Sequence, residues 1–181
     1  AKALEIDDEL AEAHISLGYA SFTYDWDWPA AVTHFDRALA LNRTAVLNHS
    51  YYPFYLTVGN RPDEAIDVAR RALVQDPLSA SASHTLAVQL SLARKHDETI
   101  EESRRTVDLN PSFSLGYHMM AVSFAAKGMY REALPLMERG AAASPPNLIT
   151  GALIGYVHAR LGQRQQALQE LEKLSASSKT Q

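Results

Sequence analysis

The sequence contains no cysteine among its 181 residues, and only two of its residues are tryptophan. The lack of cysteine excludes disulfide bonds, thiolate catalysis and zinc sites with thiolate ligands. No apolar run approaches the ~18 residues that indicate a membrane span, and the acidic start, AKALEIDDEL, lacks the apolar segment of a signal peptide. The net charge is only −4, so the chain exerts no general electrostatic attraction on nucleic acid or acidic membranes.

Enzyme signatures are also lacking. The sequence has no HExxH, P-loop, GxSxG or GxGxxG motif, so nothing in it indicates a metal, a nucleotide or an activated serine. Hydrophobic residues make up 46% and charged residues 21%, which is ordinary for a folded globular chain and excludes a disordered one. We therefore expect a folded protein that is not an enzyme and has no catalytic residues, no cofactor and no bound metal.

A repeat of roughly 34 residues runs along the chain. Pro77, Pro111 and Pro145 recur at this interval, and so do Gly128 and Gly162. A fixed period of this length is typical of repeat proteins in which each unit is one supersecondary element.

Each repeat contains two segments with apolar residues at helical spacing. In the third repeat they are residues 79–94 and 97–109, where Asp97 is predicted to cap the second helix and Pro111 follows its end. The pattern predicts antiparallel helix pairs that bury their apolar faces against neighbouring pairs. Pro53 falls inside the first helix of the second repeat, so we expect a kink near His49 to Pro53.

The repeating residues resemble the tetratricopeptide repeat family, whose pattern has a bulky residue at position 4, Leu at 7, a small residue at 8, Ala at 20, an aromatic residue at 24, Ala at 27 and Pro at 32. The residues that stand at these positions include Leu17, Gly18, Ala31 and Phe35 in the first repeat; Ala65, Ala69, Ala72 and Pro77 in the second; Leu86, Ala87 and Pro111 in the third; Tyr117, Ala121, Ala133 and Pro145 in the fourth; and Ile154, Gly155, Ala167 and Leu171 in the fifth. In the third repeat, Thr99, Ser103 and Thr106 replace the expected small and aromatic residues. The resemblance implies an all-α fold: a right-handed superhelical solenoid of about five helix-turn-helix repeats.

The repeat frame predicts one solenoid domain over residues 1–181. Its parts are the end of a preceding, truncated repeat (1–8), four repeats (9–43, 44–77, 78–111 and 112–145), a last repeat (146–174) and a polar tail (175–181). The start in mid-repeat indicates a fragment of a longer protein. Without a capping helix after it, the last helix is expected to expose Leu168, Leu171 or Leu174.

Both tryptophans lie in one stretch, YDWDWPAA, in the turn of the first repeat. This repeat is one residue longer than the others, and the extra residue falls in this stretch. Asp27 is predicted to cap the second helix, and Trp28 and Ala31 to pack between the two helices. Trp26 is the inserted residue or its neighbour, with no predicted orientation. Turn and cap are favoured over a carbohydrate platform or a metal site.

The resemblance places one set of positions on the concave face of the solenoid, where such repeats bind partners. The residues predicted to line this groove are Ile15, Tyr19, Phe22, Ser50, Phe54, His84, Val88, His118, Val122 and Tyr156, with Glu12, Leu47, Ser81, Leu115 and Ile149 at a further groove position. They include no Lys, Arg or Asn to clamp a carboxylate, so the groove is apolar. Some could instead be core between repeats. A metal shared by His84 and His118 is disfavoured, because neighbouring helices pack about 8–10 Å apart.

A basic residue recurs at position 26 of every repeat. These residues are Lys2, Arg37, Arg71, Arg105, Arg139 and Lys173. Such a stripe could follow a phosphate backbone, but interleaved acids and the negative net charge favour a local role near the helix C-terminus.

Taken together, the sequence predicts a non-catalytic scaffold that binds a peptide or partner domain in the apolar groove. YDWDWPAA and the later RALALN also resemble repeats of bacterial multidomain regulators that carry winged-helix, Ser/Thr kinase or cyclase domains. We expect protein or peptide partners, no nucleic acid or membrane, and a cytoplasmic location, with the periplasm as the alternative. Self-association through uncapped ends is the second hypothesis, and a small-ligand receptor or enzyme is the third.

Overall fold

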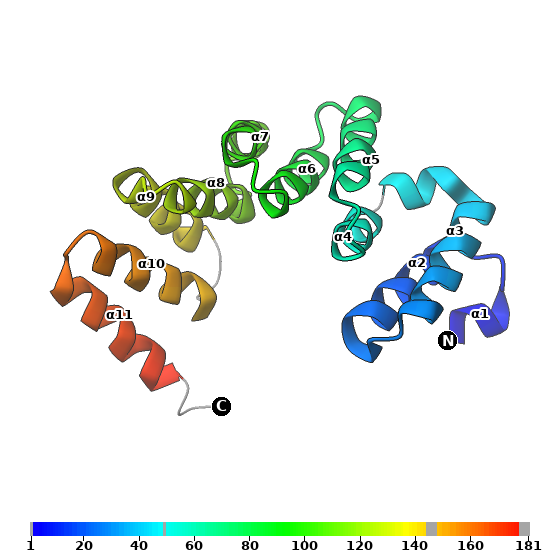
Figure 1. Ribbon diagram of the computed structural model, residues 1–181, viewed down its shortest axis with the longest axis horizontal. Helices are drawn as coiled ribbons and strands as arrows, with labels where there is room; N and C mark the ends of the chain where they lie inside the picture. The colour runs from blue at the N-terminus through cyan, green and yellow to red at the C-terminus, as the bar shows by residue number, and fades with distance from the viewer. Residues whose placement is uncertain (1, 49, 144–147, 178–181) are drawn as a thin grey trace. The chain divides into compact units, whose positions relative to one another are not determined.

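The structure is a computed structural model that describes residues 2–48, 50–143 and 148–177. These residues form eleven α-helices and one π-helical turn, with no β-strand among them. In chain order they are α1 (Lys2–Ile6), α2 (Ala11–Ala20), η1 (Ser21–Asp25), α3 (Trp28–Asn48), α4 (Tyr51–Val58), α5 (Pro62–Gln75), α6 (Ala80–Leu92), α7 (His96–Leu109), α8 (Ser114–Ala126), α9 (Tyr130–Ala142), α10 (Leu148–Arg160) and α11 (Arg164–Ser177). Consecutive helices form antiparallel pairs, as the period of the sequence predicts (Figure 1).

The chain forms two compact units, Ala1–Pro77 and Leu78–Gln181, called here the first and second unit. Their boundary coincides with the predicted boundary between repeats 44–77 and 78–111. In the first unit α2 packs against α3 and α4 against α5. In the second unit α6 pairs with α7, α8 with α9 and α10 with α11.

A left-handed residue ends the first helix of each pair. Asn60, Arg94, Gly128 and Gly162 have positive φ, between 60° and 77°, and follow one another at intervals of one repeat length. The next N–H closes the turn by donating to a carbonyl five residues back, as from Lys95 to Leu90 at 2.9 Å. This is the hydrogen bond by which a left-handed residue commonly terminates a helix.

Trp26, at φ 56°, holds the same left-handed position in the first pair, one repeat length before Asn60. Here the following N–H, of Asp27, reaches one residue further back, to the carbonyl of Ser21 at 2.9 Å. The π-helical turn η1 therefore absorbs the extra residue of the first repeat. Trp26 is the ordinary turn residue, and its side chain is 74% exposed.

Asp27, Trp28 and Ala31, which follow this turn, lie at the start of α3. Asp27 accepts a hydrogen bond from the N–H of Ala30 at 3.0 Å, so it caps α3 as predicted. Trp28 stacks near Phe22, with ring centroids 5.8 Å apart, and Ala31 is fully buried. YDWDWPAA is thus a structural turn whose second tryptophan belongs to the core.

Extended residues separate successive pairs. Asn42, Asp76 and Asn110 recur at the repeat period, with φ between −131° and −150°. Proline follows Asp76 and Asn110 and disfavours helix at the residue before it. Arg43 follows Asn42 instead, and the helix resumes at once, so that α3 continues to Asn48.

The expected kink in the second repeat falls partly outside the description, because His49 is not among the described residues. A new helix, α4, begins at Tyr51, so Pro53 lies in a first turn. An N–H in a first turn has no partner within the helix, so proline is tolerated there.

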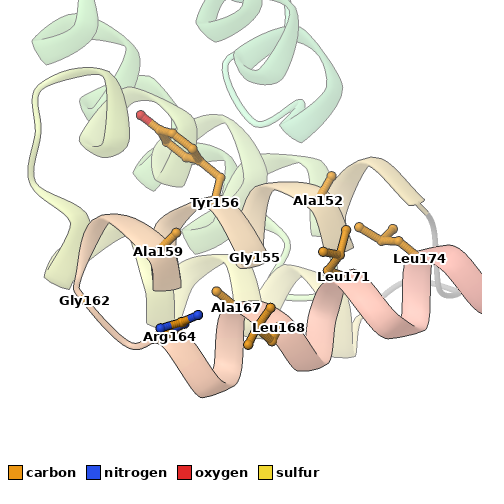
Figure 2. A pocket seen from close by; sticks show the side chains of 10 residues that line it. All are labelled: Ala152, Gly155, Tyr156, Ala159, Gly162, Arg164, Ala167, Leu168, Leu171 and Leu174. Carbon is orange, nitrogen blue, oxygen red and sulfur yellow. The ribbon is translucent and has the colours of Figure 1, made fainter.

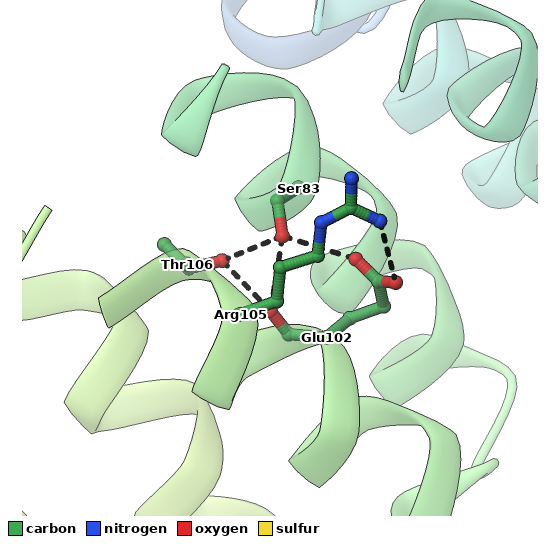
Figure 3. A network of polar contacts seen from close by, with 4 residues as sticks. All are labelled: Ser83, Glu102, Arg105 and Thr106. Carbon is green, nitrogen blue, oxygen red and sulfur yellow. Dashed lines mark hydrogen bonds and ion pairs between the residues drawn. The ribbon is translucent and has the colours of Figure 1, made fainter. Parts of the chain in front are cut away.

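The core of the third repeat is polar where the family pattern is apolar. Ser83, Thr99, Ser103 and Thr106 are all fully buried between α6 and α7. Ser83 Oγ donates toward Glu102 and accepts from Thr106 Oγ1 at 3.1 Å (Figure 3). Asp97 does not cap α7 as predicted: the helix begins at His96 after Lys95, and Asp97 lies in the first turn, paired with Lys127.

Candidate functional site

In the first unit the predicted groove residues lie in or against an aromatic core. Ile15 and Phe22 are 0% and 3% exposed, so their side chains offer almost no surface to a partner. Tyr19 and Phe54 are half-buried, and Tyr19 stacks on Tyr51 with ring centroids 3.8 Å apart. The repeat frame could not show how many rings would converge on these positions.

In the second unit the predicted residues remain closer to the surface. His84 and Val88 on α6 and His118 and Val122 on α8 are half-buried, and Tyr156 on α10 is 47% exposed.

Two further apolar residues of the same frame are more open. Leu115, at the start of α8, is 52% exposed, and Ile149, at the start of α10, is 71% exposed. Leu115 lies three and seven residues before His118 and Val122, which places all three on one face of α8. The predicted groove positions of the second unit therefore include apolar side chains that water reaches. Ser50, the remaining predicted groove residue, is exposed in the first unit.

His84 and His118 lie close enough to influence each other. Burial, with a smaller contribution from the charge of His118, lowers the pKa of His84 to about 4. Burial also lowers the pKa of His118. The His84 ring lies 5.2 Å from that of Phe113, and its Nδ1 has no hydrogen-bond partner in the described structure. Both imidazoles are therefore neutral at pH 7 and add polarity without charge.

The described residues include no group of three or more His, Asp or Glu side chains that could hold a metal ion. Among the described helices, none combines the length and apolarity that a membrane crossing requires.

An aromatic and cationic cluster borders the face beside Tyr156. Tyr130 of α9 and Tyr156 meet edge to face, with ring centroids 6.1 Å apart, and the guanidinium of Arg160 lies 4.9 Å from the Tyr130 ring. The hydrogen bond to Tyr156 raises the pKa of Tyr130. Sequence reasoning missed Tyr130 and Arg160, because neither stands at a predicted groove position.

The last helix pair forms an open apolar groove of about 550 Å³ between α10 and α11 (Figure 2). Its lining includes Leu168 and Leu171, which are 48% and 57% exposed, and the half-buried Leu174. The sequence predicted exposed leucines on the last helix. It did not indicate that α10 completes a groove with them through Ala152, Gly155 and Ala159.

The recurrent basic residues make local contacts. Arg37 pairs with Glu9 at 4.0 Å, Arg105 with Glu102 at 3.8 Å and Lys173 with Glu170 at 2.6 Å. The guanidinium of Arg139 lies 4.8 Å from the ring of Tyr117 and donates to its hydroxyl at 3.2 Å. Because these basic side chains interact with residues of the chain itself, a local structural role is favoured over a basic stripe that binds phosphates. Arg71 is exposed, and the side chain of Lys2 lies outside the description.

Comparison with known proteins yields neither a matching family model nor a matching curated protein. Solved structures do match. PilW, a widely conserved type IV pilus biogenesis factor, superposes with a TM-score of 0.81 at 19% identity, covering 97% of this chain and 81% of PilW. A thermophilic TPR protein of Thermus thermophilus gives a TM-score of 0.76 at 14% identity, covering 91% and 89% of the two chains. YrrB, described as a TPR protein with an unusual peptide-binding site, gives 0.60 at 22%, covering 96% and 89%.

These identities are low, so the likeness concerns the fold. The chain has the all-α tetratricopeptide-repeat fold, which confirms the fold class predicted from its sequence.

Proposed function

We propose that this chain is a non-catalytic protein-interaction module that binds an apolar peptide segment on the first-helix face of its second unit. This face comprises His84 and Val88 of α6, Leu115, His118 and Val122 of α8, and Ile149 and Tyr156 of α10. The observation that carries the proposal is the exposure of Leu115, Ile149 and Tyr156, by 52%, 71% and 47%, at groove positions of two successive first helices.

Single exposed apolar residues are normal on protein surfaces, but a set aligned over successive repeats is typical of a partner site. Neutral His84 and His118 can give directional hydrogen bonds without attracting charge. The face holds no lysine or arginine at its groove positions, so an apolar ligand is favoured over an acidic chain terminus. The peptide-binding site named for YrrB, which shares the fold, supports peptide as the ligand class.

Peptide selection on the whole chain tests this proposal. A random peptide phage library is panned against the protein, and the strongest binder is synthesised and measured by isothermal titration calorimetry. We expect apolar and aromatic sequences to be enriched. The double variant Leu115→Ser with Ile149→Ser should weaken the peptide roughly tenfold, because both side chains lose apolar contact area.

The matched control is Val74→Ser on α5, since Val74 is 78% exposed and lies on a second helix, outside the face. It should leave the affinity unchanged. Failure to enrich any peptide, or equal binding by the double variant, would contradict the proposal.

We also infer a bacterial regulatory context for this module, supported by the likeness of YDWDWPAA and RALALN to repeats of multidomain regulators. The complete reading frame tests it. A gene that encodes no winged-helix, kinase or cyclase domain beside these repeats would remove its basis.

A further inference from the structure

The groove between α10 and α11 has a counterpart inside the same unit. Six of its lining residues correspond, one repeat earlier, to six residues of α8 and α9. Gly155, Ala159, Arg164, Ala167, Leu168 and Leu171 correspond to Ala121, Ala125, Tyr130, Ala133, Leu134 and Met137. All six counterparts belong to one apolar cluster or pack against it, and α10 is the helix that closes this cluster.

The two surfaces differ in what covers them. Under α10, Ala133 and Met137 are 0% and 1% exposed, and Val157 of α10 is itself fully buried among them. On the last pair, the equivalent of Met137 is Leu171, at 57% exposure, and Leu168 is 48% exposed. The second unit thus contains the same kind of apolar groove twice: the α8/α9 groove is a socket filled by α10, and the α10/α11 groove is open.

The occupant of the filled socket defines what the open one accepts. From α10, Leu153, Ile154 and Val157 enter the cluster, followed by Leu161 just beyond the helix end. Their spacing is i, i+1, i+4 and i+8, which is one face of an α-helix. One side of the open groove is formed by small residues of α10, Ala152, Gly155 and Ala159, and the other by the leucines of α11 (Figure 2). A helix can therefore approach closely along it.

We propose that the α10/α11 groove is a receptor for one amphipathic helix of a partner protein, with apolar residues spaced i, i+1, i+4 and i+8. This groove shares Tyr156 with the proposed peptide-binding face, but its leucine wall, Leu168 and Leu171, lies on α11 and does not belong to that face. A second copy of this chain fits less well. Its outermost first helix, α2, has Ser16 and Ala20 where α10 has Leu153 and Val157, so the leucines of α11 would meet a hydroxyl and a methyl group.

The chain's own α10 sequence supplies the probe. A fluorescein-labelled peptide with residues 148–163, LITGALIGYVHARLGQ, is titrated with the full chain and followed by fluorescence anisotropy. We expect saturable binding. The double variant Leu168→Lys with Leu171→Lys should weaken it roughly tenfold or more, because two charged groups replace the apolar walls.

Two controls isolate the groove. Leu92→Lys adds the same charge at a leucine of the same 48% exposure as Leu168, outside the groove, and should bind the peptide as the wild type does. A peptide carrying Ile154→Asp and Val157→Asp should not bind, because it carries charges on the docking face.

Three outcomes would overturn the proposal. The first is no saturable binding. The second is equal binding by the Leu168→Lys, Leu171→Lys variant, which would show that the peptide displaces α10 from its own socket or lies elsewhere. The third is a dimer in light scattering that this variant abolishes, which would identify a second copy as the occupant. Loss of peptide binding in Leu115→Ser with Ile149→Ser concerns the other face alone, so the two proposals fail independently.

Discussion

Trp26 shows how a single backbone position constrains side-chain choice. It holds the left-handed conformation that Gly128 and Gly162 hold in later repeats, yet its indole is 74% exposed and gains little from burial. A residue with a Cβ in this conformation is destabilised by about 1–2 kcal/mol. The indole therefore does not stabilise the turn that its backbone forms.

The substitution Trp26→Gly is accordingly expected to keep the fold and raise the free energy of unfolding by up to about 1 kcal/mol, after the entropy cost of glycine in the unfolded chain. Chemical denaturation measures it, with Gly128→Ala as the reverse control, which should lower stability by a similar amount. A clear loss of stability in Trp26→Gly would show that the indole makes packing contacts that outweigh the strain.

His84 makes stability depend on pH. Its pKa is about 4 in the fold against 6.5 for an unperturbed histidine, so between these values the unfolded chain binds more protons. Stability is then level above pH 6.5 and falls as the pH drops toward 4, by about 2 kcal/mol. Denaturation curves at several pH values should show a shallower decline for His84→Leu. Because burial lowers the pKa of His118 as well, His118→Leu should also make the decline shallower, and an unchanged slope in His84→Leu would refute this assignment.

At the scale of the helices, the polar contact between α6 and α7 replaces an apolar one. Ser83 and Thr106 are fully buried and hydrogen-bonded to each other, and both approach Glu102. Ser83→Ala should lower the free energy of unfolding by about 1–2 kcal/mol, since it removes an acceptor for the buried Thr106 hydroxyl. Adding Thr106→Val should cost less than in the wild type, because the hydrogen bond between Thr106 and Ser83 is already lost and only the one to the Glu102 carbonyl remains. Simple additivity in this double-mutant cycle would show that the two side chains act independently.

The helices of the chain were largely predictable because their signals are local and recur. The prolines indicated the repeat period, Asp27 indicated the N-terminal cap of α3, and the small residues indicated where two helices pack closely together. The π-helical turn η1 was not predictable in place, because an inserted residue can be absorbed anywhere between Ser21 and Trp26 with little change in pattern. Asp97 failed as a cap because the helix began one residue before it, which propensity alone does not resolve.

The candidate site was predictable as a set of positions and less so as a surface. The period assigns Phe22 and Tyr156 to equivalent faces, but one is 3% and the other 47% exposed. Their difference arises from neighbours: rings of Trp28, Phe54 and Tyr55 surround Phe22. Burial depends on which side chains converge from other helices, and a repeat frame does not contain that information.

At the scale of the whole molecule, each helix pair of a repeat protein depends on its neighbours for stability. In the second unit, α8 and α9 contact helices of the pairs on both sides, α7 before them and α10 after them. The pair α10 and α11 packs against α9 on one side, and its leucines are open on the other. Even if all these helices had the same intrinsic helix propensity, the pair α10 and α11 would be less stable, because it buries less apolar surface than α8 and α9.

Native-state hydrogen exchange should therefore be graded along the second unit. Amides of α11 are expected to exchange faster than those of α8 and α9, because local opening of α11 exposes little surface that is not already exposed. Mass spectrometry of exchanged peptides measures this directly, and within α11 the leucine-bearing turns provide an internal comparison. Leu168→Lys should leave the gradient in place, since this side chain is already 48% exposed. Uniform protection from α8 to α11 would mean that the second unit opens as one cooperative body rather than pair by pair.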